Sequence, residues 1–287
     1  MRFAICNEQF EGWDFERICR YVKSVGYDGV EVAPFTLAPR ITDVDKGRRA
    51  ELRRQADGAG VRIIGLHWLL AGTEGFYLTS PDDAVRARTA QYLVDLAEAT
   101  QDFGGDLMVF GSPKQRSLPD GVTWDRAFAN ATDTFRRAMP GIAAHGVSLC
   151  MEPLAPSETD FINTAEEGAR LMEAVAHPNF VLHLDVKAMS SEPTPLADII
   201  RQYANRTGHF HANDPNRRGP GFGEVDFVPI FRVLKQSGYD RWVSVEVFDY
   251  TPDPETIAEK SIEYMKRCLS AVLPATGAIG GGTTSDV

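Results

Sequence analysis

Four polar residues in the second half of the chain stand at the ends of short apolar runs. They are Glu152, Asp185, His211 and Glu246, and the successive gaps between them are 33, 26 and 35 residues. A carboxylate at the end of an apolar strand is costly to bury unless it is paired or bound to a cation. Because each gap is the length of one strand–helix unit, four consecutive strands would each present one such group at a similar height. The spacing predicts that the four side chains meet at one site.

Three carboxylates and one imidazole form a ligand set that suits a divalent metal ion. Oxygen-rich ligation with one nitrogen fits Mn²⁺, Mg²⁺ or Co²⁺, and Zn²⁺ is also compatible with it. The alternative is that each residue pairs separately with a nearby Arg or Lys. That alternative is reasonable for any one residue, but four residues in register on consecutive strands favour a shared ion. We expect one divalent ion, with Mn²⁺ as the first choice.

The elements that would position these residues alternate between short apolar runs and longer amphipathic segments. In the first such segment, Phe15, Ile18 and Val22 recur at helical spacing. Eight alternations predict parallel strands that close into a single (β/α)8 barrel. An open doubly wound sheet is the alternative, but it would prefer a glycine-rich turn where residues 6–8 read CNE. The eight apolar runs cover residues 2–6, 29–33, 61–68, 106–110, 147–153, 180–185, 207–214 and 242–247.

No linker divides the chain, so one domain is expected. The barrel is expected to cover residues 1–273 as the catalytic domain. Residues 274–287 are rich in Gly, Ser and Thr, and they predict a flexible C-terminal tail without a site.

Composition narrows the classes of function. The formal net charge of −10 opposes nucleic-acid binding, because phosphates require a basic surface. No apolar run approaches the roughly 20 residues of a membrane span, and the first residues turn polar too early for a signal peptide. The four cysteines include no Cys-x-x-Cys pair and are interpreted as reduced thiols. We expect a cytoplasmic protein that acts on a small molecule, with no nucleic-acid or membrane partner.

Further residues near the predicted mouth of the barrel are candidates for substrate contact. His67 and Trp68 end the third apolar run, and Phe248 follows the eighth. The two aromatic rings there would form part of an apolar wall for a substrate and the imidazole would contact it, although ordinary packing is the alternative for each. Two other strand histidines are interpreted as structural: His183 and His209.

Four stretches carry a family pattern: MEPLAPSETDFINT (151–164), HLDVKAM (183–189), HFHANDPNRRGPGFGEVDF (209–227) and VSVEVFD (243–249). Through them the chain resembles the xylose isomerase-like sugar phosphate isomerase/epimerase superfamily, a group of TIM barrels. Within it, the chain is most similar to the ketose 3-epimerases of the D-tagatose and D-allulose 3-epimerase group. The similarity runs from the first strand to the last helix.

The resemblance implies roles for individual residues. The four chemistry-bearing residues match the ligands of one divalent metal in such epimerases, and Glu152 and Glu246 also match an acid/base pair. Glu158 matches a glutamate after the fifth strand that contacts substrate, and Arg217 matches an arginine after the seventh that does the same. Related epimerases form dimers or tetramers, so a homodimer or homotetramer is expected.

One position departs from the family pattern. Three residues after the metal-binding aspartate, these epimerases have a histidine that holds the substrate, and this chain has Ala188. Lys187 precedes it and is a candidate to offer a cation to a substrate oxygen instead, although a solvent-facing lysine is an equal alternative. The departure concerns the substrate and the reaction rather than the metal ligands.

The chemistry implied is proton abstraction next to a carbonyl through a metal-stabilised enediolate. Return of the proton on the other face gives epimerisation, and return at the neighbouring carbon gives isomerisation. Loss of a substituent from the same enediolate would make a lyase or dehydratase acting on a keto-sugar, an inosose or a 3-keto-glycoside, and that is the main alternative. A non-catalytic sugar-binding barrel and a DNA-repair endonuclease are more remote, the second because it needs three zinc ions and more histidines.

Overall fold

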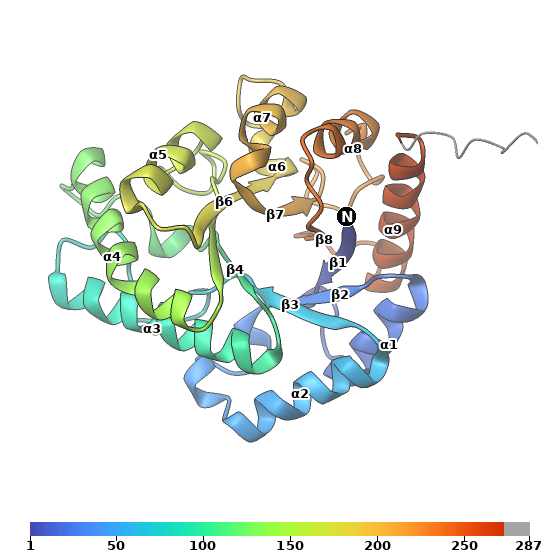
Figure 1. Ribbon diagram of the computed structural model, residues 1–287, viewed down its shortest axis with the longest axis horizontal. Helices are drawn as coiled ribbons and strands as arrows, with labels where there is room; N and C mark the ends of the chain where they lie inside the picture. Colours follow the sequence, from blue (N-terminus) through green and yellow to red (C-terminus); the bar gives the residue numbers. More distant parts are fainter. Residues whose placement is uncertain (273–287) are drawn as a thin grey trace, which may run out of the picture.

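Eight parallel strands close into a barrel in the computed structural model, which describes residues 1–272 (Figure 1). Each strand pairs with the next along the chain, and β1 pairs with β8 to complete the ring. The predicted (β/α)8 barrel is therefore confirmed, and the predicted tail lies outside the described residues. The strands are β1 (Arg2–Cys6), β2 (Gly29–Val32), β3 (Arg62–Leu66), β4 (Leu107–Phe110), β5 (Ser148–Met151), β6 (Phe180–Asp185), β7 (Thr207–Ala212) and β8 (Trp242–Val245).

Helices between the strands form the outer ring of the barrel (Figure 1). Several begin at side chains that cap the first turn: Asp14 accepts a hydrogen bond from the Arg17 amide at 2.8 Å, and Thr164 accepts one from the Glu167 amide at 3.1 Å. The α-helices are α1 (Phe15–Val25), α2 (Lys46–Ala59), α3 (Asp83–Phe103), α4 (Trp124–Ala144), α5 (Ala165–Val175), α6 (Val186–Met189), α7 (Leu196–Tyr203), α8 (Phe227–Gln236) and α9 (Pro254–Ser270). Short 3₁₀ turns are η1 (Pro34–Thr36), η2 (Ile41–Asp43), η3 (Pro113–Gln115) and η4 (Ala204–Arg206).

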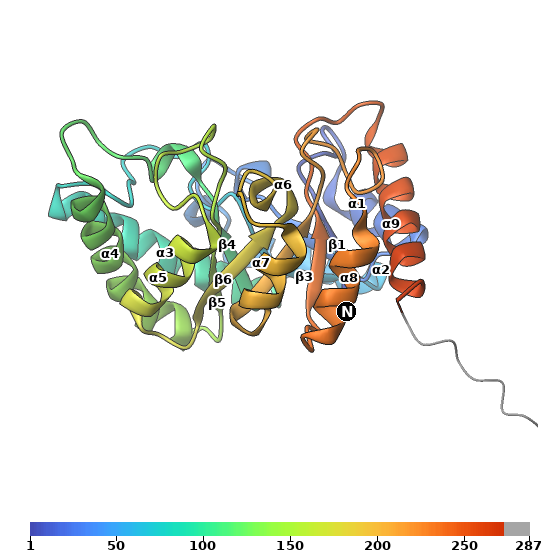
Figure 2. The same cartoon turned by 90° about the horizontal axis from the view of Figure 1, so that it is seen from above.

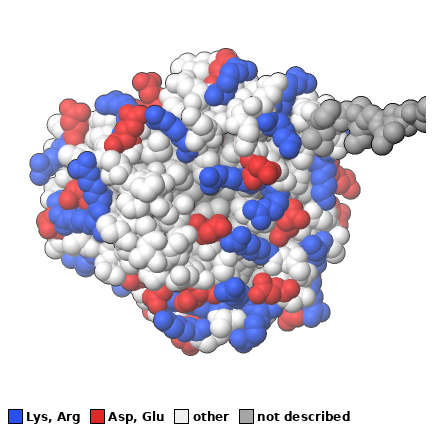
Figure 3. Space-filling model, viewed as in Figure 1, with Lys and Arg blue, Asp and Glu red and all other residues white. Residues whose placement is uncertain are grey.

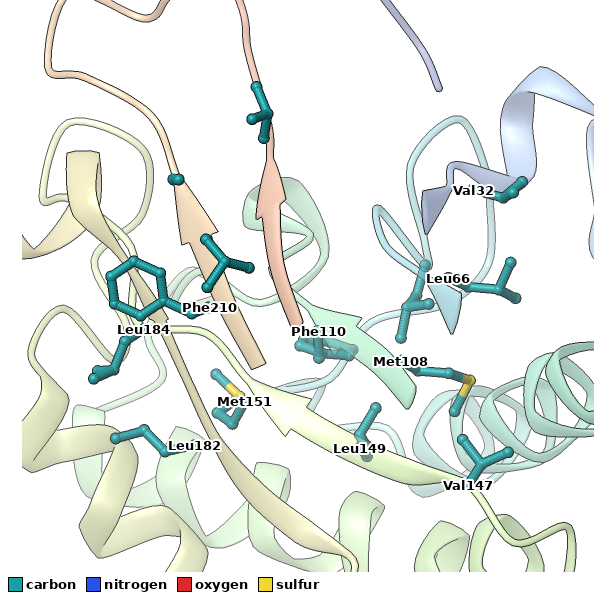
Figure 4. Close-up of a cluster of buried hydrophobic side chains, with 14 of the residues drawn as sticks. Val32, Leu66, Met108, Phe110, Val147, Leu149, Met151, Leu182, Leu184 and Phe210 are labelled. Carbon is teal, nitrogen blue, oxygen red and sulfur yellow. The ribbon is translucent and has the colours of Figure 1, made fainter. Parts of the chain in front are cut away.

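The apolar core has two parts because side chains alternate between the two faces of a strand. The larger part includes Leu149, Met151, Leu182, Leu184 and Phe210, which Figure 4 shows among other buried side chains of the same cluster. The smaller part joins apolar residues of alternate positions inside the barrel. Its members are Ala4, Ile64, Leu107, Val109, Cys150 and Trp242. Leu107 and Trp242 begin their strands and the other four are third residues of theirs, whereas the polar side chains Glu152, Asp185 and Glu246 stand at or directly after the strand ends.

The connections that follow the strands gather at one end of the barrel. Figure 2 shows them at its upper edge together with α6, opposite the N-terminus. On the face shown in Figure 3, acidic and basic side chains are interspersed around a broad area without charged residues. Within residues 1–272, no helix has the length and apolar character needed to cross a membrane. The end to which the strands point is where a (β/α)8 barrel places its functional groups.

Candidate active site

The alternation of the strands brings the predicted metal ligands to one place inside the barrel mouth. Asp185 ends β6, His211 lies one residue before the end of β7, and Glu152 and Glu246 directly follow β5 and β8. All four side chains are buried. Ligand atoms of Glu152, Asp185, His211 and also His183 lie within 4.8 Å of one another. Glu246 joins the group through His211, because Oε2 of Glu246 is 3.0 Å from Nδ1 of His211.

His183, interpreted from the sequence as structural, lies against this group. Its Nε2 is 3.9 Å from Oε1 of Glu152, and its ring centroid is 4.2 Å from that of His211. Neither of its ring nitrogens has a hydrogen-bond partner among the described residues, although the ring is fully buried. A buried imidazole without partners is unusual, because unpaired polar atoms are costly in a protein interior. Its place beside three candidate ligands makes it part of the site's polar surroundings.

Glu31 of β2 is a residue of the site that the sequence interpretation missed. Its carboxylate is fully buried and faces Nε2 of His209 at 2.8 Å and Nε2 of His211 at 3.2 Å. Because Nε2 of His211 faces Glu31, Nδ1 of the same ring is directed towards Glu246. The signal was present in the run GVEVA, where one acidic residue interrupts a strand that is otherwise apolar.

Asp185 is held by the segment that departs from the family pattern. Its Oδ1 accepts a hydrogen bond from the Ala188 amide at 2.7 Å, and its Oδ2 accepts one from Nδ2 of Asn213 at 2.5 Å. Oδ1 of Asn213 in turn accepts the Lys187 amide at 2.8 Å. The backbone of α6 therefore fixes the carboxylate, and the side chain at position 188 takes no part in doing so.

Arg116 is a second functional residue that sequence reasoning missed. It follows η3, it is fully buried, and its guanidinium donates to the carbonyl oxygens of Glu152 at 2.6 Å, Gly111 at 3.2 Å and Ile162 at 2.7 Å. These bonds tie the ends of β4 and β5 to the loop before α5, and so they position Glu152. Nothing in the surrounding polar sequence KQRS distinguishes this arginine from an exposed one.

The predicted substrate-contact residues surround two adjoining depressions at the mouth. His67, Trp68, Glu158 and Phe248 line a small cavity together with the two catalytic candidates, Glu152 and Glu246. Trp68 and Phe248 meet edge to face with ring centroids 6.2 Å apart. Next to this cavity is a larger hollow, whose lining includes Trp68, Glu158, Lys187, Arg217 and Phe248.

Lys187 and His67 each face a carboxylate at this mouth. Nζ of Lys187 is 2.7 Å from Oε2 of Glu158 and 4.6 Å from the centre of the Phe248 ring. Nε2 of His67 is 2.9 Å from Oε2 of Glu8. Lys187 is therefore a residue of the mouth, and the alternative of a solvent-facing lysine does not describe it.

The electrostatics of the site reflect several acids crowded into a buried space. Burial raises the pKa of Glu152 well above its usual range, and the charges of Glu246 and Asp185 raise it further. Burial also raises the pKa of Asp185 to about 6. For Glu246, burial opposes ionisation, but the charge of His211 and its hydrogen bond outweigh burial and lower the pKa.

A cation among the oxygens of Glu152, Asp185 and Glu246 would favour the ionised forms of these carboxyls. The donor set, in which the nitrogens of His183 also lack partners, fits a divalent metal ion.

The fold and this site together define a (β/α)8 protein with a carboxylate–histidine centre at the barrel mouth. Comparison with known families gives a match to the xylose isomerase-like TIM barrel over residues 19–268. The chain belongs to this family, as the sequence predicted.

Individual relatives and solved structures agree with that assignment. The chain is 31% identical over 257 residues to an L-ribulose 3-epimerase of Mesorhizobium japonicum, which covers 86% of this chain and 80% of the relative. It is 28% identical over 254 residues to a D-psicose 3-epimerase of Ruminiclostridium cellulolyticum, covering 86% of this chain and 82% of the relative. A crystal structure of D-psicose 3-epimerase with D-tagatose from Clostridium cellulolyticum H10 superposes with a TM-score of 0.83 at 22% identity, over 94% of this chain and 99% of the other.

Proposed function

We propose that the protein is a divalent-metal-dependent sugar isomerase that abstracts a proton next to a carbonyl, as a ketose 3-epimerase would. The observation that carries this proposal is the convergence of three carboxylates and one imidazole beside a cavity that two of the glutamates line. The relatives named as ketose 3-epimerases support the same class of reaction.

The residues that would hold the ion are Glu152, Asp185, His211 and Glu246. When bound, a divalent cation, which we expect to be Mn²⁺, supplies electrostatic stabilisation of the negative charge that develops on the substrate oxygens. Around it, Glu31 and Asn213 hold His211 and Asp185 in fixed orientations. Such hydrogen-bonded neighbours keep metal ligands in place before the ion arrives.

Glu152 and Glu246 are the proposed acid/base pair. Without an ion, burial raises the pKa of Glu152, whereas the pKa of Glu246 is lowered because His211 outweighs burial; a bound cation would favour the ionised form of both. Both glutamates line the same cavity, so a sugar carbon there would lie beside both carboxyls. One of the two would take the proton from carbon, and the other would return a proton to the other face.

Six residues are proposed to hold the sugar itself. Glu158 and Lys187 would offer an acceptor and a donor for sugar hydroxyls, since the two already face each other at 2.7 Å. Trp68 and Phe248 provide an apolar wall, and a substrate between such walls is oriented by a few polar groups. The remaining two are His67, which lines the small cavity, and Arg217, which lines the larger hollow.

The test is to replace the two glutamates. In the Mn²⁺-supplemented protein, Glu152→Gln and Glu246→Gln are each expected to lower turnover of a ketose panel by about 10²–10⁴-fold, which is the usual contribution of a general acid or base. The double variant is expected to contain no bound metal by elemental analysis. Glu263→Gln is the matched control, because that glutamate is exposed on α9. A double variant that kept both metal and activity would overturn the assignment.

Three further expectations remain proposals. A lyase or dehydratase reaction on a keto-sugar, an inosose or a 3-keto-glycoside stays the second candidate, because Ala188 stands where the related epimerases have a substrate-binding histidine. Analysis of the products separates elimination from epimerisation. The cytoplasmic location is checked by cell fractionation, and the homodimer or homotetramer by light scattering.

A further inference from the structure

Epimerisation by two glutamates leaves one of them with an extra proton and the other without its own. A second turnover in the same direction therefore requires Glu246 to exchange a proton with solvent, but Glu246 is only 4% exposed. The small cavity beside it measures about 20 Å³, roughly the room of one water molecule, so a bound sugar excludes water from it. While a sugar is bound, the proton needs another route.

His67 is the group through which such a route can leave Glu246. Carboxylate oxygens and a ring nitrogen of Glu8, His67 and Glu246 lie within 4.8 Å of one another, and all three side chains are buried. Nε2 of His67 is 2.9 Å from Oε2 of Glu8, which is hydrogen-bond distance. The step from His67 to Glu246 is one that a single water molecule or substrate hydroxyl bridges. An imidazole in such a place is suited to carry protons.

The other titratable neighbours lead further into the barrel. Cys6 and Glu31 also have ligand atoms within 4.8 Å of a ring nitrogen of His67. His211, the hydrogen-bond partner of Glu246, faces Glu31 in turn. None of Cys6, Glu31 and His211 is more than 1% exposed, so these branches end inside the protein. The carboxylate after β1 is left as the outward step.

Glu8 lines a hollow of about 590 Å³ formed mainly by the loops after β1 and β2, which we call the β1–β2 hollow. It shares no lining residue with the small cavity, so a sugar in that cavity does not fill it. Exposed carboxylates make this hollow acidic, and negative charge raises the local concentration of cations, protons included. They belong to Glu11, Asp14, Asp43 and Asp45.

From this arrangement we infer that His67 and Glu8 relay protons between Glu246 and the water of the β1–β2 hollow while a sugar occupies the small cavity. Protonated Glu246 gives its proton to His67, which becomes an imidazolium and passes a proton to Oε2 of Glu8. Glu8 releases that proton to water, so Glu246 loses one proton and the solvent gains one. The reverse sequence supplies Glu246 with a proton. This inference rests on the proposed function, because it concerns how one of the two proposed acid/base groups is reset.

The first measurement separates the chemical step from the reset in the Mn²⁺-loaded protein with D-psicose. Protein in excess over sugar gives the rate of a single turnover, which needs no reset, and sugar in excess gives the steady-state rate, which does. Glu8→Gln keeps the shape of the side chain but removes the carboxylate. It is expected to lower the steady-state rate by at least about tenfold and to leave the single-turnover rate little changed. Added imidazole, a diffusible proton carrier, should restore part of the loss.

Glu11→Gln is the matched control, because Glu11 lines the same hollow from an exposed position and has no contact with His67. Both of its rates should equal those of the unaltered protein. Circular dichroism verifies that the two variants are folded.

The second measurement needs no turnover. In the Mg²⁺-loaded protein with ¹⁵N-labelled histidine, NMR follows exchange of the His67 ring proton with water, and His67→Gln identifies the signal. The relay predicts that this proton exchanges readily although the ring is only 1% exposed. Glu8→Gln should slow the exchange by at least about tenfold, since the outward step is lost, and Glu11→Gln should not.

Three results would rule the relay out. They are a single-turnover rate that falls as much as the steady-state rate in Glu8→Gln, a steady-state rate that Glu8→Gln leaves unchanged, and a His67 proton that does not exchange with water in the unaltered protein. Absence of turnover with every sugar would instead contradict the proposed function, and exchange of the His67 proton would still decide the relay.

Discussion

Folding and metal binding favour opposite protonation states of Asp185. Burial raises the pKa of Asp185 from 3.8 to about 6. The folded, metal-free protein therefore holds this proton more tightly than the unfolded chain does, and its free energy of unfolding falls as the pH rises from 3.8 to about 6. A bound cation favours the ionised form of Asp185 instead, because a ligand carboxylate must be ionised.

Metal affinity is consequently expected to depend on pH. Below pH 6, protonation of Asp185 should weaken Mn²⁺ binding by about tenfold per pH unit, and the raised pKa of Glu152 should steepen the dependence. Calorimetric titration at pH 5, 6 and 7.5 measures this directly, with circular dichroism to verify that the protein stays folded. Equal affinity at the three pH values would contradict the assignment of these two carboxylates.

Glu31 is expected to act on the metal site through His211. Glu31→Gln keeps the shape of the side chain but removes the charge that faces Nε2 of His211 at 3.2 Å. Loss of such a partner typically costs about 10–100-fold in metal affinity. Glu8→Gln is a matched control, since Glu8 is also buried against a histidine but faces His67. If both variants bound Mn²⁺ as tightly as the unaltered protein does, Glu31 would have a structural role and no effect on the metal site.

The residues of the site differ in how far the sequence could reveal them. Glu152 and Asp185 were predictable because burying a carboxylate at the end of an apolar strand is costly unless it is paired or bound to a cation. Glu31 offered the same signal in β2 and was overlooked. Arg116 offered none, because its burial arises from loops that only the folded barrel brings together.

The residue that follows β4, Gly111, leaves room for Glu152, the glutamate that follows β5. A methyl group added at Gly111 would lie 2.3 Å from Oε2 of Glu152. The absence of a side chain at Gly111 thus leaves the space that the carboxylate occupies. This close approach between neighbouring strand ends, rather than backbone conformation, is the reason for glycine there.

Gly111→Ala is therefore expected to displace a carboxylate more than to unfold the barrel. We expect turnover and Mn²⁺ affinity to fall by at least about tenfold, which is the scale for disturbing a metal ligand's support. The thermal midpoint should change little, because the displaced atom ends a flexible side chain. Gly58→Ala in α2 is the control, since its added methyl meets nothing within 4 Å and helix propensity favours alanine by about 1 kcal/mol. Full activity in Gly111→Ala would show that Glu152 does not need its present position.

The eight strands were predictable because a strand buried in a parallel barrel is apolar on both faces. The run 147–153 gave β5, and the run 61–68 gave β3 with one extra residue at its start and two at its end. The pairing of Lys187 with Glu158 was not predictable, because it joins α6 to the loop after β5. Contacts between a loop and a distant element depend on backbone paths that no local pattern encodes.

For the molecule as a whole, the proposed ion would join the ends of β5, β6, β7 and β8, a contiguous half of the barrel. A ligand that binds only the folded state stabilises it, by about 2.7 kcal/mol at a hundredfold excess over Kd. Mn²⁺ is therefore expected to raise the thermal midpoint of the protein relative to a sample with EDTA. The Glu152→Gln, Glu246→Gln double variant serves as the control, and an equal shift in that variant would place the ion elsewhere.

The core of the proposed function is that Glu152 and Glu246 remove and return a proton next to a sugar carbonyl. Deuterium incorporation from D₂O into a keto-sugar, followed by NMR with the Mn²⁺-supplemented protein, tests it most directly. Label is expected at one carbon adjacent to the carbonyl, and none is expected with the Glu152→Gln, Glu246→Gln double variant. Turnover that leaves that carbon unlabelled, or labelling by the double variant, would contradict it.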